Sequence, residues 1–285
     1  MSLQSTIEAI IATLSPSERR VAEIIRSNPS VVLTHSITEL ADASSTSMAT
    51  VVRFCRSIGL PGYSNLRMQL ATELGMEAAQ FGPTLNSGAD IHPDDSLSEA
   101  MAKIAGLEKL AIDETVAATD LDRLAHLADL IDKAPRILCF GMGGSHLVAE
   151  DLCQKLLRMN HNALCPNDSH DAWVHAGLAP QGTVAIGFSH SGQTDETARF
   201  LSTARERGAT TVAVTSVTDS AVAAMADMLI RTVARDTSLR TGAMVSRTAQ
   251  LCVVDMVSVA VARLHYDDTL AAMKVASRVI RTSKN

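Results

Sequence analysis

The fold is decided by residues 183–194, TVAIGFSHSGQT. Residues 183–188 form a nearly continuous apolar run, which is typical of a strand buried on both faces of a parallel sheet. A helical pattern begins at Asp195, so the polar residues between form a loop at the carboxyl end of a strand, where open α/β sheets bind ligands. Backbone N–H groups at a helix start favour an anion such as phosphate. The small donors and the glycine of this loop are Ser189, Ser191, Thr194 and Gly192. On its own, so short a turn is equally compatible with an ordinary strand–helix connection.

A second loop of the same kind precedes it in the chain. Residues 136–140, RILCF, have the pattern of another buried strand, and 141–145, GMGGS, lead into a helical segment. A dinucleotide-binding GxGxxG loop would need a glycine where His146 stands, and an acidic residue after the next strand to bind ribose. Asp168 meets the second requirement, so nucleotide binding stays open as the minor alternative. The paired glycine-and-hydroxyl loops resemble more closely those with which sugar isomerase (SIS) domains bind phosphosugars.

Strand and helix patterns alternate through the second half of the chain. We predict strands at 136–140, 161–165, 183–188, 211–215 and 228–233, and helices at 145–159, 169–178, 194–207, 219–226 and 245–264. This alternation predicts an α/β fold with a doubly wound, mostly parallel sheet. We assign the α/β domain to 126–268 and a helical tail to 269–285. The last predicted helix opens with SRTAQ, residues 246–250, which we interpret first as a structural or dimer element, with a contact from Arg247 to a phosphate as the alternative.

Composition excludes several classes of protein. The chain has 285 residues, 46% of them hydrophobic and 3% aromatic, which is enough for two domains with aliphatic cores. Its net charge of −6 excludes a uniformly basic coat for nucleic acid, although not a local basic patch. Five cysteines without a CxxC pair are typical of reduced thiols, and the scattered histidines lack metal-site spacing, so we expect no metal and no cofactor. A signal-peptide pattern and an apolar run of about 18 residues are both missing, which predicts a cytoplasmic protein without a membrane span.

The first 77 residues are predicted to form a helical domain. Residues 15–18, SPSE, and 36–39, SITE, have the spacing of capping boxes at helix starts. Residues 44–46, SST, form a polar turn, after which Ser47 is placed to cap a helix over 48–58. Two helices joined by a short polar turn form the helix-turn-helix (HTH) arrangement, whose second helix enters the major groove of DNA.

The turn and its second helix carry a local positive charge. Residues 44–70 contain three arginines and neither Asp nor Glu, so this window is the candidate phosphate-facing surface. A helical hairpin whose charges happen to share one sign is the alternative. The predicted base contacts lie early in the second helix and are Ser47, Met48, Thr50 and Val51, of which Val51 equally suits a core position. The predicted phosphate contacts are Arg53, Arg56, Tyr63 and Arg67.

Residues 47–63, SMATVVRFCRSIGLPGY, resemble the S-x-x-T-V-x-R-F-x-x-x-L-G-x-x-G-[YF] signature of RpiR-type regulators. That family joins an N-terminal HTH domain to a C-terminal SIS domain, and the resemblance extends over nearly the whole chain. Within the family, the chain is most similar to MurR-type repressors of N-acetylmuramic acid 6-phosphate use. One departure is Ser45, which stands where the family usually has a turn glycine. A non-glycine residue at positive φ costs about 1 kcal/mol.

The resemblance implies roles for both predicted loops. The hydroxyl loop would hold the phosphate of a phosphosugar, while the glycine loop would lie against the sugar. The residues expected at the phosphate are Ser189, Ser191 and Thr194, with His190 and Gly192 beside them. The residues expected at the sugar are Gly143, Gly144 and Ser145.

The resemblance also implies a DNA-binding regulator that is not an enzyme. A phosphosugar effector would change its affinity for a double-stranded DNA operator. Since HTH proteins read paired half-sites, we expect a homodimer or homotetramer. Residues 78–125 are predicted to form a linker and a connecting helix.

Two other functions stay open. A phosphosugar isomerase or etherase would need a base near the sugar, and Glu150, Asp151 and Glu196 are the candidates. The third possibility is an assembly module whose SIS domain only dimerises.

Overall fold

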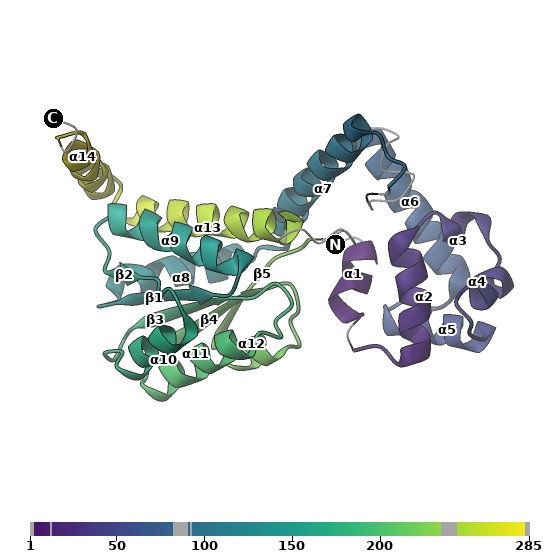
Figure 1. Cartoon of the computed structure of the whole chain (residues 1–285), viewed down its shortest axis with the longest axis horizontal. Helices are drawn as coiled ribbons and strands as arrows, with labels where there is room; N and C mark the ends of the chain where they lie inside the picture. Colours follow the sequence, from purple (N-terminus) through teal and green to yellow (C-terminus); the bar gives the residue numbers. More distant parts are fainter. Residues whose placement is uncertain (1–2, 12, 82–90, 92, 235–243, 283–285) are drawn as a thin grey trace. The chain divides into compact units, whose positions relative to one another are not determined.

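The computed structural model of the chain describes residues 3–11, 13–81, 91, 93–234 and 244–282. The chain forms two compact units, the first of which extends to Glu114 while the second starts at Thr115. Each has its own hydrophobic core. Figure 1 shows a helical unit and a unit built around a sheet. Most of the predicted linker, residues 82–90, lies outside the described part of the chain.

The first unit is built from helices. They are α1 (Leu3–Ile10), α2 (Pro16–Ser27), α3 (Val31–Thr34), α4 (Ile37–Ala43), α5 (Met48–Ser57), α6 (Tyr63–Phe81) and α7 (Leu97–Ala118), the last of which runs on into the second unit. Ile25, Leu40 and Phe54 are fully buried in its core. The sequence did not predict α3, because four residues are too few to show a helical period.

The helix starts confirm one of the two predicted capping boxes. Ser36 accepts a hydrogen bond from the Glu39 backbone N–H, and the Glu39 carboxylate accepts one from the Ser36 N–H. The box predicted at Ser15 is wrong, because the Ser15 hydroxyl bonds the carboxylate of Glu18 and no side chain caps α2. Ser47 caps α5 as predicted.

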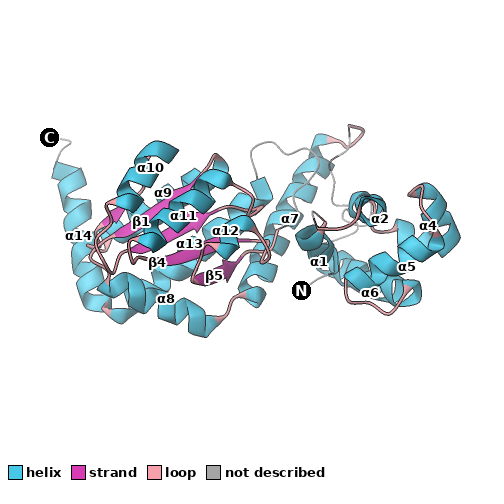
Figure 2. Cartoon of the chain, turned by 90° about the horizontal axis from the view of Figure 1, so that it is seen from below, coloured by secondary structure: helices cyan, strands magenta, loops and turns pink. Residues whose placement is uncertain are grey.

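The second unit is the predicted doubly wound α/β fold. Its elements are α8 (Leu121–Lys133), β1 (Ile137–Gly141), α9 (Gly144–Arg158), β2 (Ala163–Leu164), α10 (Ser169–Gly177), β3 (Val184–Phe188), α11 (Asp195–Glu206), β4 (Thr210–Thr215), α12 (Ala221–Ala224), β5 (Met228–Arg231), α13 (Met244–Leu264) and α14 (Tyr266–Thr282). The five strands are parallel, in the order β2-β1-β3-β4-β5. Figure 2 shows this sheet between its helices.

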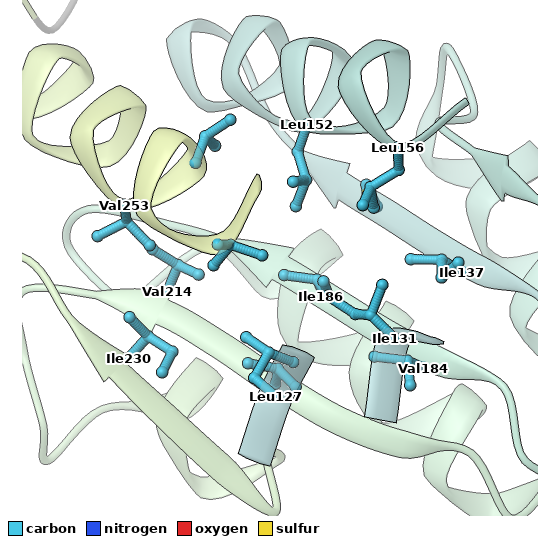
Figure 3. Close-up of a cluster of buried hydrophobic side chains, with 14 of the residues drawn as sticks. Leu127, Ile131, Ile137, Leu152, Leu156, Val184, Ile186, Val214, Ile230 and Val253 are labelled. Carbon is cyan, nitrogen blue, oxygen red and sulfur yellow. The ribbon is translucent and has the colours of Figure 1, made fainter. Parts of the chain in front are cut away.

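Alternate residues along each strand supply the cores on the two faces of the sheet. On one face, α8, α9 and α13 cover Ile137, Val184, Ile186, Val214 and Ile230, which meet Leu127, Ile131, Leu152, Leu156 and Val253 of these helices (Figure 3). On the other face, α10, α11 and α12 cover smaller and aromatic side chains such as Ala185, Ala213 and Phe140. Since both faces are covered, the strands read as continuous apolar runs.

Helix α13 bears on the expectation that the chain has no membrane span. It is the one helix within the described residues that is long and apolar enough to cross a membrane by length and composition, and half of its most apolar stretch is buried inside the unit. Its valines Val253, Val254, Val257 and Val261 belong to the core on the sheet. We therefore assign its apolar character to packing in the core.

The five cysteines are free thiols. Cys55 and Cys139 are fully buried within the two cores. Burial raises the pKa of Cys55 to about 11 and that of Cys165 to about 12, so these thiols stay protonated near neutral pH. They act as small apolar side chains, as the sequence predicted.

Candidate functional site

The two predicted loops lie at the point where the strand order of the sheet reverses. The chain runs from β1 outward to β2 on one side, and from β3 through β4 to β5 on the other. In open α/β sheets of this order, ligands bind outside the carboxyl ends of the strands at the β1/β3 point. Gly141 pairs with Phe188 in the register of β1 and β3. The loops 141–145 and 189–194 therefore leave the sheet side by side.

The hydroxyl loop, residues 189–194, is held by its own side chains. The Ser189 and Thr194 hydroxyls lie 2.9 Å apart, and the Gly192 N–H donates to Ser189 Oγ at 3.1 Å. Ser189 is buried, whereas Ser191 is exposed and accepts from the Gln193 N–H at 3.3 Å. Thr194 is the N-cap residue of α11, but its side chain does not cap the helix. The first turn of α11 thus presents backbone N–H groups at this loop, which is a suitable environment for an anion.

Gly192 is required by the geometry of its neighbours. Its φ is +67°, and a Cβ there would lie 2.2 Å from Ser220 Oγ and 3.1 Å from Thr215 Oγ1. The residues at the end of β4 also support the hydroxyl loop. The hydroxyls of Thr215 and Ser216 donate to the His190 carbonyl oxygen at 3.1 and 2.8 Å. Sequence reasoning missed Ser220, whose signal is its place as the N-cap of α12.

The glycine loop, residues 141–145, approaches the neighbouring backbone closely. A Cβ on Gly141 would lie 2.8 Å from the Ser145 carbonyl oxygen and 2.9 Å from that of Phe188. Gly143 has a φ of +56° and is the N-cap of α9, and both it and Gly144 are accessible to solvent. The Ser145 hydroxyl donates to Gln250 Oε1 at 3.1 Å.

Gln250 connects the glycine loop to α13. Its side chain is 1% exposed, and its Nε2 has no hydrogen-bond partner among the described residues. It is the last residue of the SRTAQ segment, so the structure supports the structural interpretation of that segment. Sequence reasoning did not place Gln250 beside Ser145, because their proximity depends on how α13 packs on the sheet.

Of the acidic residues named by the alternative functions, Asp168 and Asp151 have other partners, while Glu196 is half-buried in the first turn of α11. Asp168 caps α10 by accepting from the Asp171 N–H at 3.0 Å. Asp151 forms an ion pair of 2.6 Å with Lys155, which also contacts Asp255. Burial lowers the pKa of Lys155, but its hydrogen bonds to both carboxylates outweigh this effect and raise it. Glu150 is exposed. Within the described ranges, no three His, Cys, Asp or Glu side chains gather as metal ligands do.

The predicted HTH turn joins α4 to α5. Ser45 has a φ of +49°, as expected for a residue that replaces glycine. The Arg20 guanidinium on α2 donates to the Ser44 and Ser45 carbonyl oxygens, each at 3.1 Å. This contact, which the sequence did not reveal, holds the turn in place.

The exposed face of α5 differs from the predicted one at two positions. Val51 is 0% exposed, so it belongs to the core and does not face bases. Thr50 is 4% exposed, and its hydroxyl accepts from Arg53 Nη2 at 3.1 Å. Both residues lie on the side of α5 that packs on other helices of this unit. The predicted residues that do reach the surface of α5 are Ser47, Met48, Arg53 and Arg56.

The structure gives Tyr63 and Arg67 contacts within their own unit. The Tyr63 hydroxyl donates to the His35 carbonyl oxygen at 2.8 Å, and burial raises the pKa of Tyr63. Arg67 Nη2 donates to the Leu33 carbonyl oxygen at 2.7 Å, while the side chain remains exposed. The Tyr63 hydrogen bond therefore links α6 to the chain that follows α3, and the Arg67 hydrogen bond forms a second link.

Comparison with known proteins matches both units. The model of the helix-turn-helix domain of the rpiR family matches residues 1–77, and that of the SIS domain matches residues 130–260. An uncharacterized HTH-type transcriptional regulator of Caldanaerobacter subterraneus subsp. tengcongensis is 34% identical over 280 residues, which are 98% of this chain and 97% of the relative. One of Haemophilus influenzae is 34% identical over 252 residues, or 88% of this chain and 86% of the relative.

Solved structures agree with these relatives. The Vibrio vulnificus NanR protein, complexed with ManNAc-6P, is 26% identical and superimposes with a TM-score of 0.61, covering 100% of both chains. The sugar isomerase domain of an RpiR transcription factor from Sphaerobacter thermophilus covers 62% of this chain and 98% of its own, with 20% identity and a TM-score of 0.58. The second likeness supports the fold alone. With its helix-turn-helix unit, its SIS unit and relatives that match over almost their full length, the chain belongs to the RpiR family of HTH-type transcriptional regulators.

Proposed function

We propose that this regulator is a cytoplasmic repressor of sugar or amino-sugar catabolic genes, released from or directed to its operator by a phosphosugar. The observation that carries the proposal is the pairing of Gly141 with Phe188, because it brings two loops suited to a phosphorylated ligand to one edge of the sheet. Our first candidate effector is N-acetylmuramic acid 6-phosphate. The ManNAc-6P bound by the similar NanR protein supports the same class, the N-acetylated amino-sugar 6-phosphates.

In this proposal the phosphate binds at the start of α11. The exposed Ser191 hydroxyl, Thr194 and the N–H groups of the first helical turn are its donors, while the buried Ser189 hydroxyl keeps the loop in shape. The sugar lies against Gly143, Gly144 and Ser145, with His190 at the margin. Hydrogen bonds to a charged phosphate are each worth about 1.5–3 kcal/mol.

DNA binding is assigned to the exposed residues of the HTH surface. Ser47 and Met48 lie at the start of α5, where such a helix reads base edges, and Arg53 and Arg56 are placed for phosphates. We further propose that the chain acts as a homodimer or homotetramer, because paired half-sites require paired HTH units.

A thermal-shift panel tests the effector. Ligands would be N-acetylmuramic acid 6-phosphate, ManNAc-6P, glucose 6-phosphate and unphosphorylated N-acetylmuramic acid. A ligand at 100 times its Kd stabilises the folded chain by about 2.7 kcal/mol, so we expect a clear rise in Tm for the true effector. Ser191→Ala should weaken this rise, whereas Ser202→Ala, on the same unit and with its hydroxyl bonded to the Arg199 carbonyl oxygen, should preserve it. If no phosphorylated sugar raises the Tm, the proposal fails.

A further inference from the structure

The first turns of α5 present apolar side chains to solvent. Met48 is 51% exposed, Ala49 is exposed and Val52 is half-buried. These three residues lie three and four positions apart, so they share one side of the helix, and we refer to them as the apolar patch of α5. The Thr38 hydroxyl on α4 donates to Met48 Sδ at 3.4 Å, which restrains the exposed side chain. The apolar patch therefore lies at the helix start, where the second helix of an HTH meets base edges.

The polar side chains at the same helix start are hydrogen-bonded to one another. Residues 47–53, SMATVVR, contain no Asn, Gln, Asp, Glu or Lys. Arg53 Nη2 donates to Thr50 Oγ1 at 3.1 Å, and this hydroxyl lies 3.1 Å from Ser47 Oγ. Ser47 Oγ also accepts from the Thr50 backbone N–H at 3.3 Å. Since these polar groups already bond within the chain, the apolar patch is the main feature with which the start of α5 can distinguish bases.

The two exposed sides of α5 differ in charge. Arg56 lies four residues after Val52, so it continues the side of the apolar patch and is placed for a phosphate. On the far side, the Ser57 hydroxyl donates to Glu18 Oε1 at 3.2 Å, so a carboxylate of α2 borders that side. A carboxylate repels the phosphates of DNA. The charges therefore favour a duplex that meets α5 on the side of the apolar patch.

Thymine is the base whose major-groove edge suits such a patch. Its C5-methyl group is apolar, whereas the edges of adenine, guanine and cytosine present hydrogen-bond donors and acceptors there. Covering a methyl group with an apolar side chain is favourable, while covering a donor or acceptor without a hydrogen bond is costly. The apolar patch thus fits thymine and disfavours G·C pairs.

We propose that the apolar patch of α5 reads the methyl groups of thymine, so that the operator carries A·T pairs where this helix enters the major groove. This inference rests on the proposed assignment of the HTH surface to DNA and names the chemistry that the helix recognises. Arg53 and Arg56 supply the part of the affinity that does not depend on sequence.

Uracil in place of thymine tests the inference, because uracil lacks only the methyl group. Duplexes that the full-length chain binds are selected from a random pool, and each thymine that the selected duplexes share is then replaced by deoxyuridine. Burial of one methyl group changes an affinity by about fourfold. We therefore expect fluorescence anisotropy to show a loss of ~4-fold at one or more of these thymines. Unchanged affinity after every replacement, or a selected core of G·C pairs, would overturn the inference.

Substitutions in the patch assign this effect to α5. Met48→Gln keeps the length and the helix propensity of the side chain but not its apolar character. We expect the uracil effect to vanish at the thymine that Met48 contacts, while the salt dependence of binding is retained because no phosphate contact is lost. Met101→Gln is the matched control, since Met101 is also 51% exposed but lies on α7, and it should keep the full uracil effect. If neither Met48→Gln nor Val52→Ser alters the uracil effect, α5 is not the reader and the inference fails.

The outcomes separate this inference from the proposed function. If the full-length chain selects no duplex even at low salt, the assignment of the HTH surface to DNA fails, and the reading of thymine fails with it. If the chain selects duplexes with a salt-dependent affinity that uracil does not change, the DNA assignment stands and only the reading of thymine is wrong. The thermal-shift panel decides the effector in both cases.

Discussion

At the scale of single residues, Ser45 carries the backbone strain of the HTH turn. Its φ of +49° disfavours any residue with a Cβ, and Arg20 binds its carbonyl oxygen. We expect Ser45→Gly to raise the free energy of unfolding of the helical unit by about 1 kcal/mol, through loss of this strain. Ala49→Gly in the exposed part of α5 should lower it by a similar amount, since there the helix needs no such freedom. Calorimetry measures the change in the free energy of unfolding for each variant. A change of the same sign in both would show that Ser45 is not strained.

An alanine at position 192 would have both an unfavourable φ and a close contact. The same substitution at Gly182, which shares the positive φ but not the contact, separates the two effects. Gly192→Ala places a Cβ 2.2 Å from Ser220 Oγ at a φ of +67°. Gly182→Ala has the same conformational problem at a φ of +83°, but its nearest neighbouring atom is 3.6 Å away. We expect Gly182→Ala to cost about 1 kcal/mol and Gly192→Ala about 1–3 kcal/mol more. Denaturant unfolding gives both values. A phosphosugar should no longer raise the Tm of Gly192→Ala, but should still raise that of Gly182→Ala. If both variants lose the same free energy of unfolding, the close contact at Gly192 relaxes without cost.

At the scale of elements, the sequence predicted most of the architecture because buried parallel strands leave an uninterrupted apolar signal. Strands β1, β3 and β4 and helices α9, α11 and α13 lie within one or two residues of their predicted bounds. The edge strand β2 is two residues long instead of five, since an edge strand needs pairing on one side only. The burial of Val51 and the position of Gln250 beside Ser145 could not be predicted in the same way, because the face that a helix buries depends on its neighbours in space. Periodicity shows that α5 has an apolar side, but not that Thr50 lies on it.

The arginines of α5 carry a prediction about DNA. Arg53 and Arg56 are exposed and belong to the window 44–70, which contains neither Asp nor Glu. The logarithm of the DNA-binding constant falls linearly with the logarithm of the salt concentration. Replacing both arginines by Ala should make this slope less steep by about 2, since each phosphate contact contributes about 0.9. Fluorescence anisotropy with duplex DNA at several salt concentrations measures the slope. Arg207→Ala, exposed on the other unit, should leave it unchanged. An unaltered slope in the double variant would remove both arginines from the phosphate surface.

At the scale of the whole molecule, the continuous helix α7 belongs to both units. Its carboxyl end is fastened to the sheet unit by Thr115, whose hydroxyl donates to the Val233 carbonyl oxygen at 3.1 Å and accepts from the Val233 N–H at 3.0 Å. Thr119 adds a contact of 3.9 Å to Met256 of α13, the helix that also carries Gln250 beside Ser145. A ligand that takes up the Ser145 hydroxyl competes with Gln250. Any resulting shift of α13 would act on Thr119 at the carboxyl end of α7.

Thr115→Val tests whether this fastening transmits the effector signal. The variant keeps the shape of the side chain and removes both hydrogen bonds, so the end of α7 should no longer follow the sheet unit. We expect wild-type affinity for the phosphosugar and for DNA measured separately, but a ligand-induced change in DNA affinity that falls from the ~5–150-fold of a typical coupling toward unity. Thr183→Val is the control, because that buried hydroxyl bonds the Pro180 carbonyl oxygen far from α7 in the chain. Since coupling is reciprocal, the effect of DNA on phosphosugar affinity must fall by the same factor. Wild-type coupling in Thr115→Val would place the signal elsewhere than at this contact.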